Sequence, residues 1–137
     1  MRLVVLDTNV IVSAGIKALG FPAHIVRNAI QDANIQIAVS PSIVGEYRRV
    51  SRYSKFAQYR FPPQWLEFLI EGALRFPDGE PWPHPLPDPD DGCFLSLAHK
   101  TGAWLITGNL KHYPAKAREG VTVHTPAAYV AILDEHS

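Results

Sequence analysis

Short, mainly hydrophobic stretches recur along this chain. Residues 3–6 are an unbroken apolar run, residues 35–39 and 104–107 are further apolar stretches, and residues 121–123 form a shorter one. A strand that lacks alternating polar positions is covered on both faces, as in a parallel α/β sheet. The pattern therefore predicts the strands of a mostly parallel sheet, with residues 3–6 at its centre.

Between these stretches, hydrophobic residues recur at the spacing of a helix. Helices are predicted over residues 8–16 and from Pro22, Pro41, Pro63, Pro89 and Pro126 onward. Ser40 and Thr125 each stand before a proline, which is the arrangement of an N-cap followed by the first helical residue. Six of the thirteen residues in 77–89 are proline, so this stretch is predicted to be an extended surface connector.

The length of 137 residues and a hydrophobic content of 47% are enough for one core. We expect a single domain over residues 1–137, with a core of about 2–125 and a C-terminal helix at 126–135. Cys93 is the only cysteine, so neither a disulfide within the chain nor a cysteine-rich zinc site is indicated. No apolar run has the length of a membrane span, and we expect a soluble protein in the cytoplasm.

Charge is balanced overall, with 13 basic and 13 acidic residues, but it is unevenly distributed. Residues 48–60 hold five basic residues and no acid, interleaved with aromatic residues, whereas residues 78–91 hold five acids and no Lys or Arg. An acidic pocket beside a basic, aromatic rim is expected where metal ions hold a phosphodiester and the rim binds the flanking strand. The candidate residues for binding that flanking strand are Arg48, Arg49, Arg52 and Lys55.

Parallel α/β sheets bind ligands beyond the carboxyl ends of their strands. Asp7 ends the first strand, and Asn109 follows the strand that ends at Thr107. Glu46 lies on the helix after the second strand, and Asp91 lies in the first turn of a later helix. We expect these side chains to converge at one edge of the sheet, where carboxylates suit Mg²⁺ or Mn²⁺, which can activate water for hydrolysis.

Each acid also has a simpler interpretation. Asp7 can cap the helix that follows it, and Glu46 can pair with Arg49 on the surface of its helix. Asp88 can cap the late helix, with the acids after it favouring the positive end of the helix dipole. Asp91, however, shares the inward stripe of its helix, and an inward carboxylate needs a partner or a metal.

Four motifs in order resemble those of PIN domains. They are Leu6-Asp7-Thr8-Asn9, Pro41-x-x-x-x-Glu46, Asp88-x-Asp90-Asp91-x-x-Phe94-Leu95-x-x-Ala98 and Leu105-Ile106-Thr107-Gly108-Asn109. The match covers nearly the whole chain and is similar to bacterial PIN proteins grouped with toxins of toxin–antitoxin pairs, related to VapC.

The resemblance implies a three-layer α/β/α fold and an endoribonuclease that depends on Mg²⁺ or Mn²⁺. It implies that Asp7, Glu46 and Asp91 are the catalytic acids and metal ligands. Asp90 lies at the other margin of the inward stripe and is a candidate further ligand, and the amide oxygen of Asn109 can also coordinate a metal. The resemblance further implies that nearby polar groups orient the carboxylates and water, the candidates being Thr8, Asn9 and Thr107. Family members usually carry an aspartate in place of Asn109, so a second metal is expected to bind more weakly. By the same resemblance, the partners are RNA, a cognate antitoxin and a second copy of the chain.

Two other functions fit parts of the pattern. A module that binds RNA or an antitoxin without efficient hydrolysis is suggested by Asn109. A phosphatase that uses Asp7 as a covalent nucleophile is disfavoured, because the common form needs a second aspartate where this chain has Asn9. A receiver-type phosphoacceptor domain is disfavoured because no aspartate ends a middle strand.

Overall fold

The structure is a computed structural model that describes residues 2–52 and 63–135. Its sheet has five parallel strands in the order β3-β2-β1-β4-β5. The strands are β1 (Arg2–Leu6), β2 (Ile35–Val39), β3 (Leu74–Arg75), β4 (Trp104–Ile106) and β5 (Val123–His124). The apolar run of β1 lies at the centre of the sheet, as its sequence predicts.

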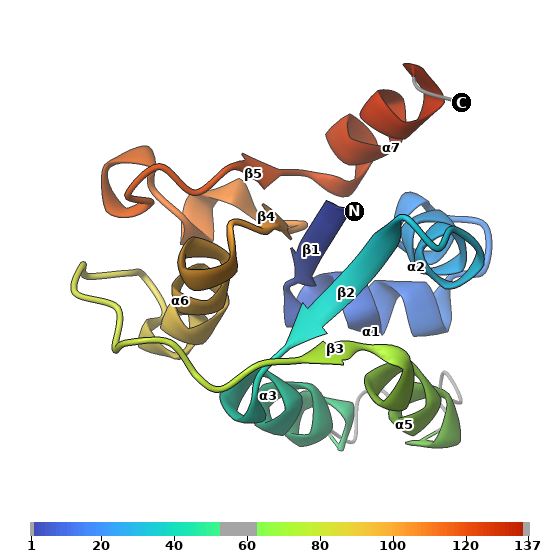
Figure 1. Ribbon diagram of the computed structural model, residues 1–137, viewed down its shortest axis with the longest axis horizontal. Coiled ribbons are helices and arrows are strands. Elements are labelled where there is room, and N and C mark those ends of the chain that lie inside the picture. Colours follow the sequence, from blue (N-terminus) through green and yellow to red (C-terminus); the bar gives the residue numbers. More distant parts are fainter. Residues whose placement is uncertain (1, 53–62, 136–137) are drawn as a thin grey trace.

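Helices cover both faces of this sheet, which gives the predicted three-layer α/β/α fold (Figure 1). They are α1 (Thr8–Ile16), α2 (Phe21–Gln31), α3 (Pro41–Ser51), α5 (Pro63–Gly72), α6 (Gly92–Thr101) and α7 (Pro126–Glu135). Helix α2 contacts α1, α7 and β2, whereas α6 contacts β1, β4 and α3. A short 3₁₀ turn at Pro89–Asp91 directly precedes α6, and two more, Leu110–His112 and Ala115–Ala117, lie between β4 and β5.

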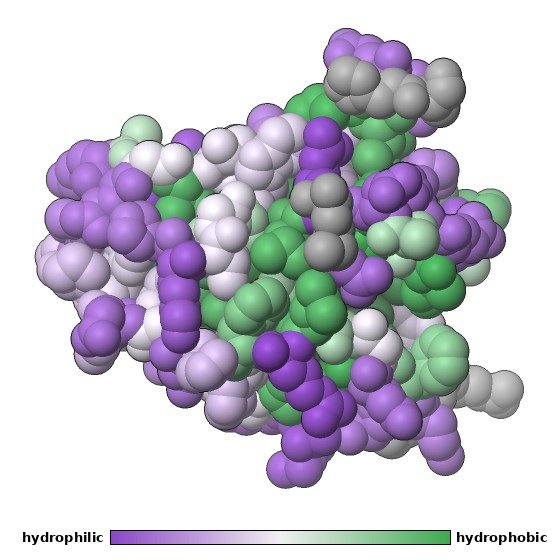
Figure 2. All heavy atoms as spheres, in the orientation of Figure 1, coloured by the Kyte–Doolittle hydropathy of each residue, from purple (hydrophilic) through white to green (hydrophobic). Residues whose placement is uncertain are grey.

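The core is built from the apolar strands and the inward faces of the helices. Val4, Val5 and Leu6 have no exposed surface, and Leu105 and Ile106 are equally buried beside them. In Figure 2 hydrophobic residues gather in the middle of the visible face, with hydrophilic residues around its margins. Burial of the two central strands fixes the position of every residue that directly follows them.

The predicted caps are confirmed. Ser40 accepts a hydrogen bond from the Ile43 amide at 3.5 Å, and Thr125 accepts one from the Ala128 amide at 3.2 Å. Residues 77–88 form neither helix nor strand, as their prolines predict. The stretch predicted as a strand at 121–123 begins pairing only at Val123, and the short β3 has no counterpart in the predicted elements.

Among the helices of the described chain, none is long and apolar enough to cross a membrane by itself. Helices α1 and α2 meet the length and composition requirement only when joined across a 96° bend.

Candidate functional site

The candidate site forms at the point in the sheet where the strand order reverses, between β1 and β4. The chain runs from β1 outward to β2 and β3 and later returns to the other side of β1 with β4. Asp7 directly follows β1 and Thr107 directly follows β4, and the Asp7 amide donates to the Ile106 carbonyl at 2.9 Å. Because parallel strands end at the same edge, their carboxyl ends bring these polar residues together at the usual ligand position of an open α/β sheet.

Asp7 is a buried carboxylate held by three side-chain donors. Its side chain makes no helix-capping hydrogen bond within the described chain, so the capping interpretation of Asp7 is not supported. Instead Oδ2 accepts from the Thr107 hydroxyl at 2.9 Å, from the Tyr113 hydroxyl at 2.8 Å and from the Asn9 amide at 3.4 Å. Burial raises the pKa of Asp7 above its usual value, and these hydrogen bonds oppose the shift.

Asp91 is the second buried carboxylate. Asp88 caps the 3₁₀ turn by accepting from the Asp90 amide at 3.0 Å, which leaves Asp91 to point inward at 8% exposure. Its Oδ2 lies 3.1 Å from His112 Nδ1. Burial raises the pKa of Asp91 to about 7, and the negative charges of Asp7 and Asp88 add to the shift. We call Asp7 and Asp91 the buried acid pair.

Residues 107–113 form a compact segment beside this pair, which we call the carboxylate loop. The Asn109 side-chain oxygen accepts from the Lys111 amide at 3.2 Å, so Asn109 caps a 3₁₀ turn. The Gly108 amide donates to the Asn9 side chain at 2.9 Å. The Thr8 hydroxyl is buried and has no hydrogen-bond partner in the part of the chain that the structure describes.

Glu46 and Asp90 differ from the buried acid pair because both contact an arginine. Arg49 Nη2 is 2.8 Å from Glu46 Oε2 and 3.8 Å from Asp90 Oδ2, so one guanidinium neutralises both acids. The surface pairing of Glu46 with Arg49 is thus present, and Asp90 keeps 65% of its side chain exposed. We call Glu46 and Asp90 the arginine-bound acid pair.

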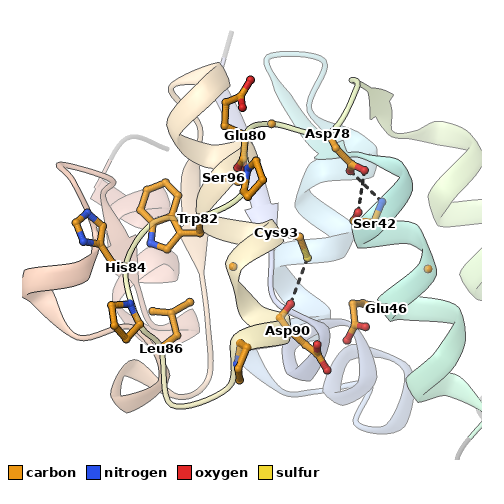
Figure 3. A pocket seen from close by; sticks show the side chains of 16 residues that line it. Ser42, Glu46, Asp78, Glu80, Trp82, His84, Leu86, Asp90, Cys93 and Ser96 are labelled. Carbon is orange, nitrogen blue, oxygen red and sulfur yellow. Dashed lines mark hydrogen bonds between the residues drawn. The ribbon is translucent and has the colours of Figure 1, made fainter.

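A groove of about 820 Å³ runs between α3 and α6 and is bordered by the proline-rich connector. Figure 3 shows Glu46 and Asp90 at one end of this groove, from its two walls, with Cys93 between them and Asp78. Its lining combines those acids and Glu80 with Trp82, Leu86 and several prolines, and it contains no Lys or Arg among the described residues. We call this cavity the acidic groove.

Cys93 is a protonated thiol within this acidic surrounding. Burial raises its pKa to about 12, and the charges of Glu46, Asp91, Asp78 and Asp7 add to the shift. A thiol in this state is a poor nucleophile and a poor metal ligand. The shift also shows that Glu46 and Asp91 both lie within electrostatic reach of Cys93.

The described residues contain no group of three His, Cys, Asp or Glu side chains placed to hold a metal ion. The buried acid pair nevertheless suits a hard divalent cation, because two interacting carboxylates in a dry site favour a positive charge between them. The unpartnered Thr8 hydroxyl fits a group that a bound ion or its water would contact. Glu46 would join such a site only after leaving Arg49.

The predicted RNA-binding residues are only partly described. Arg48 pairs with Glu67, and Arg49 pairs with the two acids above. Arg52 is exposed at the C-cap of α3. Lys55 and the rest of the basic run up to Arg60 lie outside the described residues.

Two aromatic residues at this site were not among the predicted site residues. Tyr113 is fully buried and bonds Asp7, and Tyr47 is buried with its hydroxyl donating to the Leu6 carbonyl. His112 also contacts Asp91, and its position three residues after Asn109 is a sequence feature that could have marked it. No comparable spacing signal marks the two tyrosines, because they are separated from their partners by much of the chain.

Comparisons with known proteins agree with this architecture. A family model described as PIN domain matches residues 3–111, and PIN domains are generally nucleases. No curated protein matches the chain significantly.

Solved structures with the same fold include three toxin–antitoxin proteins. VapBC2 from Rickettsia felis, bound to a DNA fragment from its promoter, has a TM-score of 0.64 at 18% identity, covering 90% of this chain and 98% of that one. FitAB bound to an IR36 DNA fragment has a TM-score of 0.57 at 19% identity, covering 90% and 94%. FitAcB from Neisseria gonorrhoeae has a TM-score of 0.57 at 18% identity, covering 90% and 98%. With four-fifths of its length matched by the family model, this chain belongs to the PIN domain family.

Proposed function

We propose that this chain is a Mg²⁺- or Mn²⁺-dependent endoribonuclease that hydrolyses single-stranded or looped RNA. The observation that carries the proposal is the buried acid pair at the carboxyl end of the central strand: burial raises the pKa of both carboxyls, and the charge of Asp7 adds to the shift of Asp91. A structural pair of this kind is costly without a cation, because two buried like charges destabilise the fold.

Asp7 and Asp91 would hold the cation, with Glu46 and Asp90 at its outer side. A bound divalent cation lowers the pKa of water and offsets the charge that builds up on the phosphate. Thr107 and Asn9 orient the Asp7 carboxylate, and the unpartnered Thr8 hydroxyl supplies one further polar contact. In this division of roles the nucleophile would be water, and neither a cysteine nor a histidine nucleophile is required.

Cleavage of RNA by highly purified protein tests the proposal. We expect single-stranded RNA to be cut with Mn²⁺ or Mg²⁺ and to stay intact in excess EDTA. The matched control is Glu71→Gln, which changes an exposed acid at the end of α5, away from the acids of the site. Equal cleavage with and without EDTA would contradict the metal-dependent mechanism.

The substrate strand would lie along the surface that carries Arg52. Arg48 and Arg49 are already paired with acids, so their positive charge is partly cancelled before RNA arrives. RNA contacts would also come from Lys55 and from Lys111, which is exposed in the carboxylate loop. Each phosphate contact releases a counterion, so binding would weaken as salt rises.

We further propose that the chain is the toxin of a toxin–antitoxin pair and forms a homodimer. VapBC2 and FitAB, which share its fold, are toxin–antitoxin complexes bound to DNA. The acidic groove supports a protein partner, because its carboxylates would repel RNA and its apolar lining suits a peptide. Light scattering across a wide concentration range tests the dimer, and only monomer would contradict it.

A second candidate is a PIN module that binds RNA or an antitoxin with little hydrolysis. Two observations favour it: Glu46 is held by Arg49, and no three-ligand group is present among the residues described. RNA binding without metal-dependent turnover would select this function. Turnover that requires Mn²⁺ would select the nuclease.

A further inference from the structure

Two neighbouring residues of the carboxylate loop each contact one member of the buried acid pair. The Tyr113 hydroxyl donates to Asp7 Oδ2 at 2.8 Å, and His112 Nδ1 lies 3.1 Å from Asp91 Oδ2. The two acids come from different elements, the end of β1 and the turn before α6. One short segment therefore contacts both carboxylates: Tyr113 by a hydrogen bond, and His112 by a close approach to an Asp91 oxygen that has no other polar partner among the described residues.

We propose that the carboxylate loop positions Asp7 and Asp91 for one divalent cation, with Tyr113 and His112 as positioning residues. The inference rests on the proposed function, because it assigns these residues a part in the same metal site. Mg²⁺ demands a near-ideal octahedral arrangement of oxygens, so the spacing of two carboxylates decides how tightly it binds. Hydrogen-bonded partners of ligating carboxylates commonly set that spacing.

The loop is braced well enough to act in this way. The Arg118 Nε donates to the Tyr113 carbonyl at 2.8 Å, and Tyr113 is fully buried. At the other end, a Cβ on Gly108 would lie only 3.1 Å from the Asn9 side-chain oxygen, so the backbone is packed closely there. Tyr113 and His112 are thus fixed from both sides.

Asn109 also helps to shape the carboxylate loop. Its side-chain oxygen accepts from the Lys111 amide and closes the turn that delivers His112. At the position where the family usually carries an acid, this chain uses the side chain to shape the loop.

Tyr113 and His112 are not placed to take part in bond breaking themselves. Burial raises the pKa of the Tyr113 hydroxyl, and the charges of Asp7 and Asp91 raise it further, so it remains a hydrogen-bond donor. Its hydrogen goes to Asp7, and His112 Nδ1 faces Asp91. Both residues would act on the reaction through the carboxylates they hold.

Mn²⁺ binding to the whole chain without RNA tests this inference, with the electron paramagnetic resonance signal of free Mn²⁺ as the readout. Tyr113→Phe and His112→Leu are each expected to raise the Mn²⁺ dissociation constant by about 10–100-fold. His112→Asn, whose amide nitrogen replaces Nδ1, is expected to restore most of the affinity. His112→Gln, which places its nitrogen near Nε2 instead, is expected to resemble His112→Leu. In cleavage assays, kcat is expected to fall while KM for RNA stays near the wild-type value.

Thermal unfolding separates positioning from folding. Should Tyr113→Phe fail to fold, the His112 variants keep the test valid, because that side chain is 38% exposed. Wild-type Mn²⁺ affinity in both Tyr113→Phe and His112→Leu would overturn the inference. So would rescue by Gln but not by Asn, since His112 would then act through Nε2.

The outcomes for the nuclease and for the loop are distinct. A wild-type chain that binds Mn²⁺ without cutting RNA would overturn the nuclease and leave the positioning role supported by the variants. A wild-type chain that cuts RNA while the variants bind Mn²⁺ normally would overturn only the positioning role. A wild-type chain that binds no Mn²⁺ would overturn both.

Discussion

The buried acid pair and the arginine-bound acid pair each join two carboxylates from separate elements, but their surroundings differ. Asp7 and Asp91 are 4% and 8% exposed and contact hydroxyl, amide and imidazole groups. Glu46 and Asp90 have 21% and 65% of their side chains exposed and share Arg49. A guanidinium thus balances the charge of the second pair, whereas the first pair contacts no Lys or Arg within the described chain.

This difference favours the buried acid pair as the place where the proposed cation would bind. Burial disfavours charge on both Asp7 and Asp91, and the charge of Asp7 disfavours charge on Asp91 further, so a divalent ion would offset both effects. The arginine-bound acid pair already has its counter-charge, so a cation would have to compete with Arg49. We therefore propose the main metal-holding role for the buried acid pair and a supporting role for Glu46 and Asp90.

Removing the acids one at a time should separate the two pairs most clearly. Asp7→Asn and Asp91→Asn are expected to lower kcat by about a thousandfold or more, because several kcal/mol of charge stabilisation is lost and each 1.4 kcal/mol is tenfold. RNA binding should remain measurable. Glu46→Gln is expected to lower kcat by about 10–100-fold, as for a group at the outer side of a metal.

Single-turnover cleavage at saturating Mn²⁺ measures these effects, with Glu71→Gln as the matched change of an exposed acid. Full activity in Asp7→Asn or Asp91→Asn would contradict the proposal that the buried acid pair is the catalytic site. A larger loss in Glu46→Gln than in Asp91→Asn would reverse the order of the two pairs.

The pH dependence of stability should also distinguish the pairs. The pKa of Asp91 is about 7 in the folded chain, against 3.8 when unperturbed, and the pKa of Asp7 is raised as well. Between these values the folded state binds more protons than the unfolded state, so stability falls as pH rises from about 4 to about 7. The metal-free chain is therefore expected to melt at a higher temperature at pH 5 than at pH 8.

Thermal unfolding in EDTA checks this expectation, and Asp91→Asn should remove most of the slope. Glu46→Gln is the control, because it removes an acid that pairs with Arg49 and lies outside the buried acid pair. A wild-type chain that is more stable at pH 8 than at pH 5 would show that the buried acids do not carry the titration.

A smaller effect is expected for RNA binding on α3. Arg52→Gln should weaken binding and reduce the salt slope by about one counterion, because a phosphate contact is lost. Arg48→Gln should change the slope less, since Glu67 already cancels much of that charge. Fluorescence anisotropy at several salt concentrations measures both. Equal slopes for both variants would mean that the Glu67 pair opens when RNA binds.

The sequence predicted the features that depend on local rules. Ser40 and Thr125 cap their helices because an N-cap before proline is a local signal, and residues 3–6 form the central strand because an apolar run needs cover on both faces. The inward direction of Asp91 followed from its place on the helical stripe. In contrast, β3 has only two residues, both exposed, and carries no such signal.

The partners of the acids were harder to predict. Tyr113 bonds Asp7 across 106 positions of sequence, and such a contact depends on how β4 and the carboxylate loop pack beside β1. Glu46 shows the opposite case, because its local pairing with Arg49 was one of the two interpretations open from sequence, and the structure contains it. Whether Glu46 also approaches a cation stays a prediction.

The smallest expected effect concerns Asn109, which stands where PIN proteins usually carry an aspartate. Its side chain can be interpreted either as a weakened metal ligand or as part of the turn. If the missing charge limits metal binding, Asn109→Asp should lower the Mn²⁺ dissociation constant. If its side chain serves the turn, Asp should accept from the Lys111 amide equally well and leave Mn²⁺ affinity within about threefold of wild type, since capping preferences for Asn and Asp are similar. We expect the second result, because the Asn109 oxygen is already engaged. Asn109→Ala is the matched variant: it removes the cap, loosens the turn that delivers His112, and should weaken Mn²⁺ binding more than Asn109→Asp changes it. Mn²⁺ titration of the wild type, Asn109→Asp and Asn109→Ala in one buffer distinguishes the two interpretations. Tighter Mn²⁺ binding by Asn109→Asp, with unchanged binding by Asn109→Ala, would instead support Asn109 as a metal ligand.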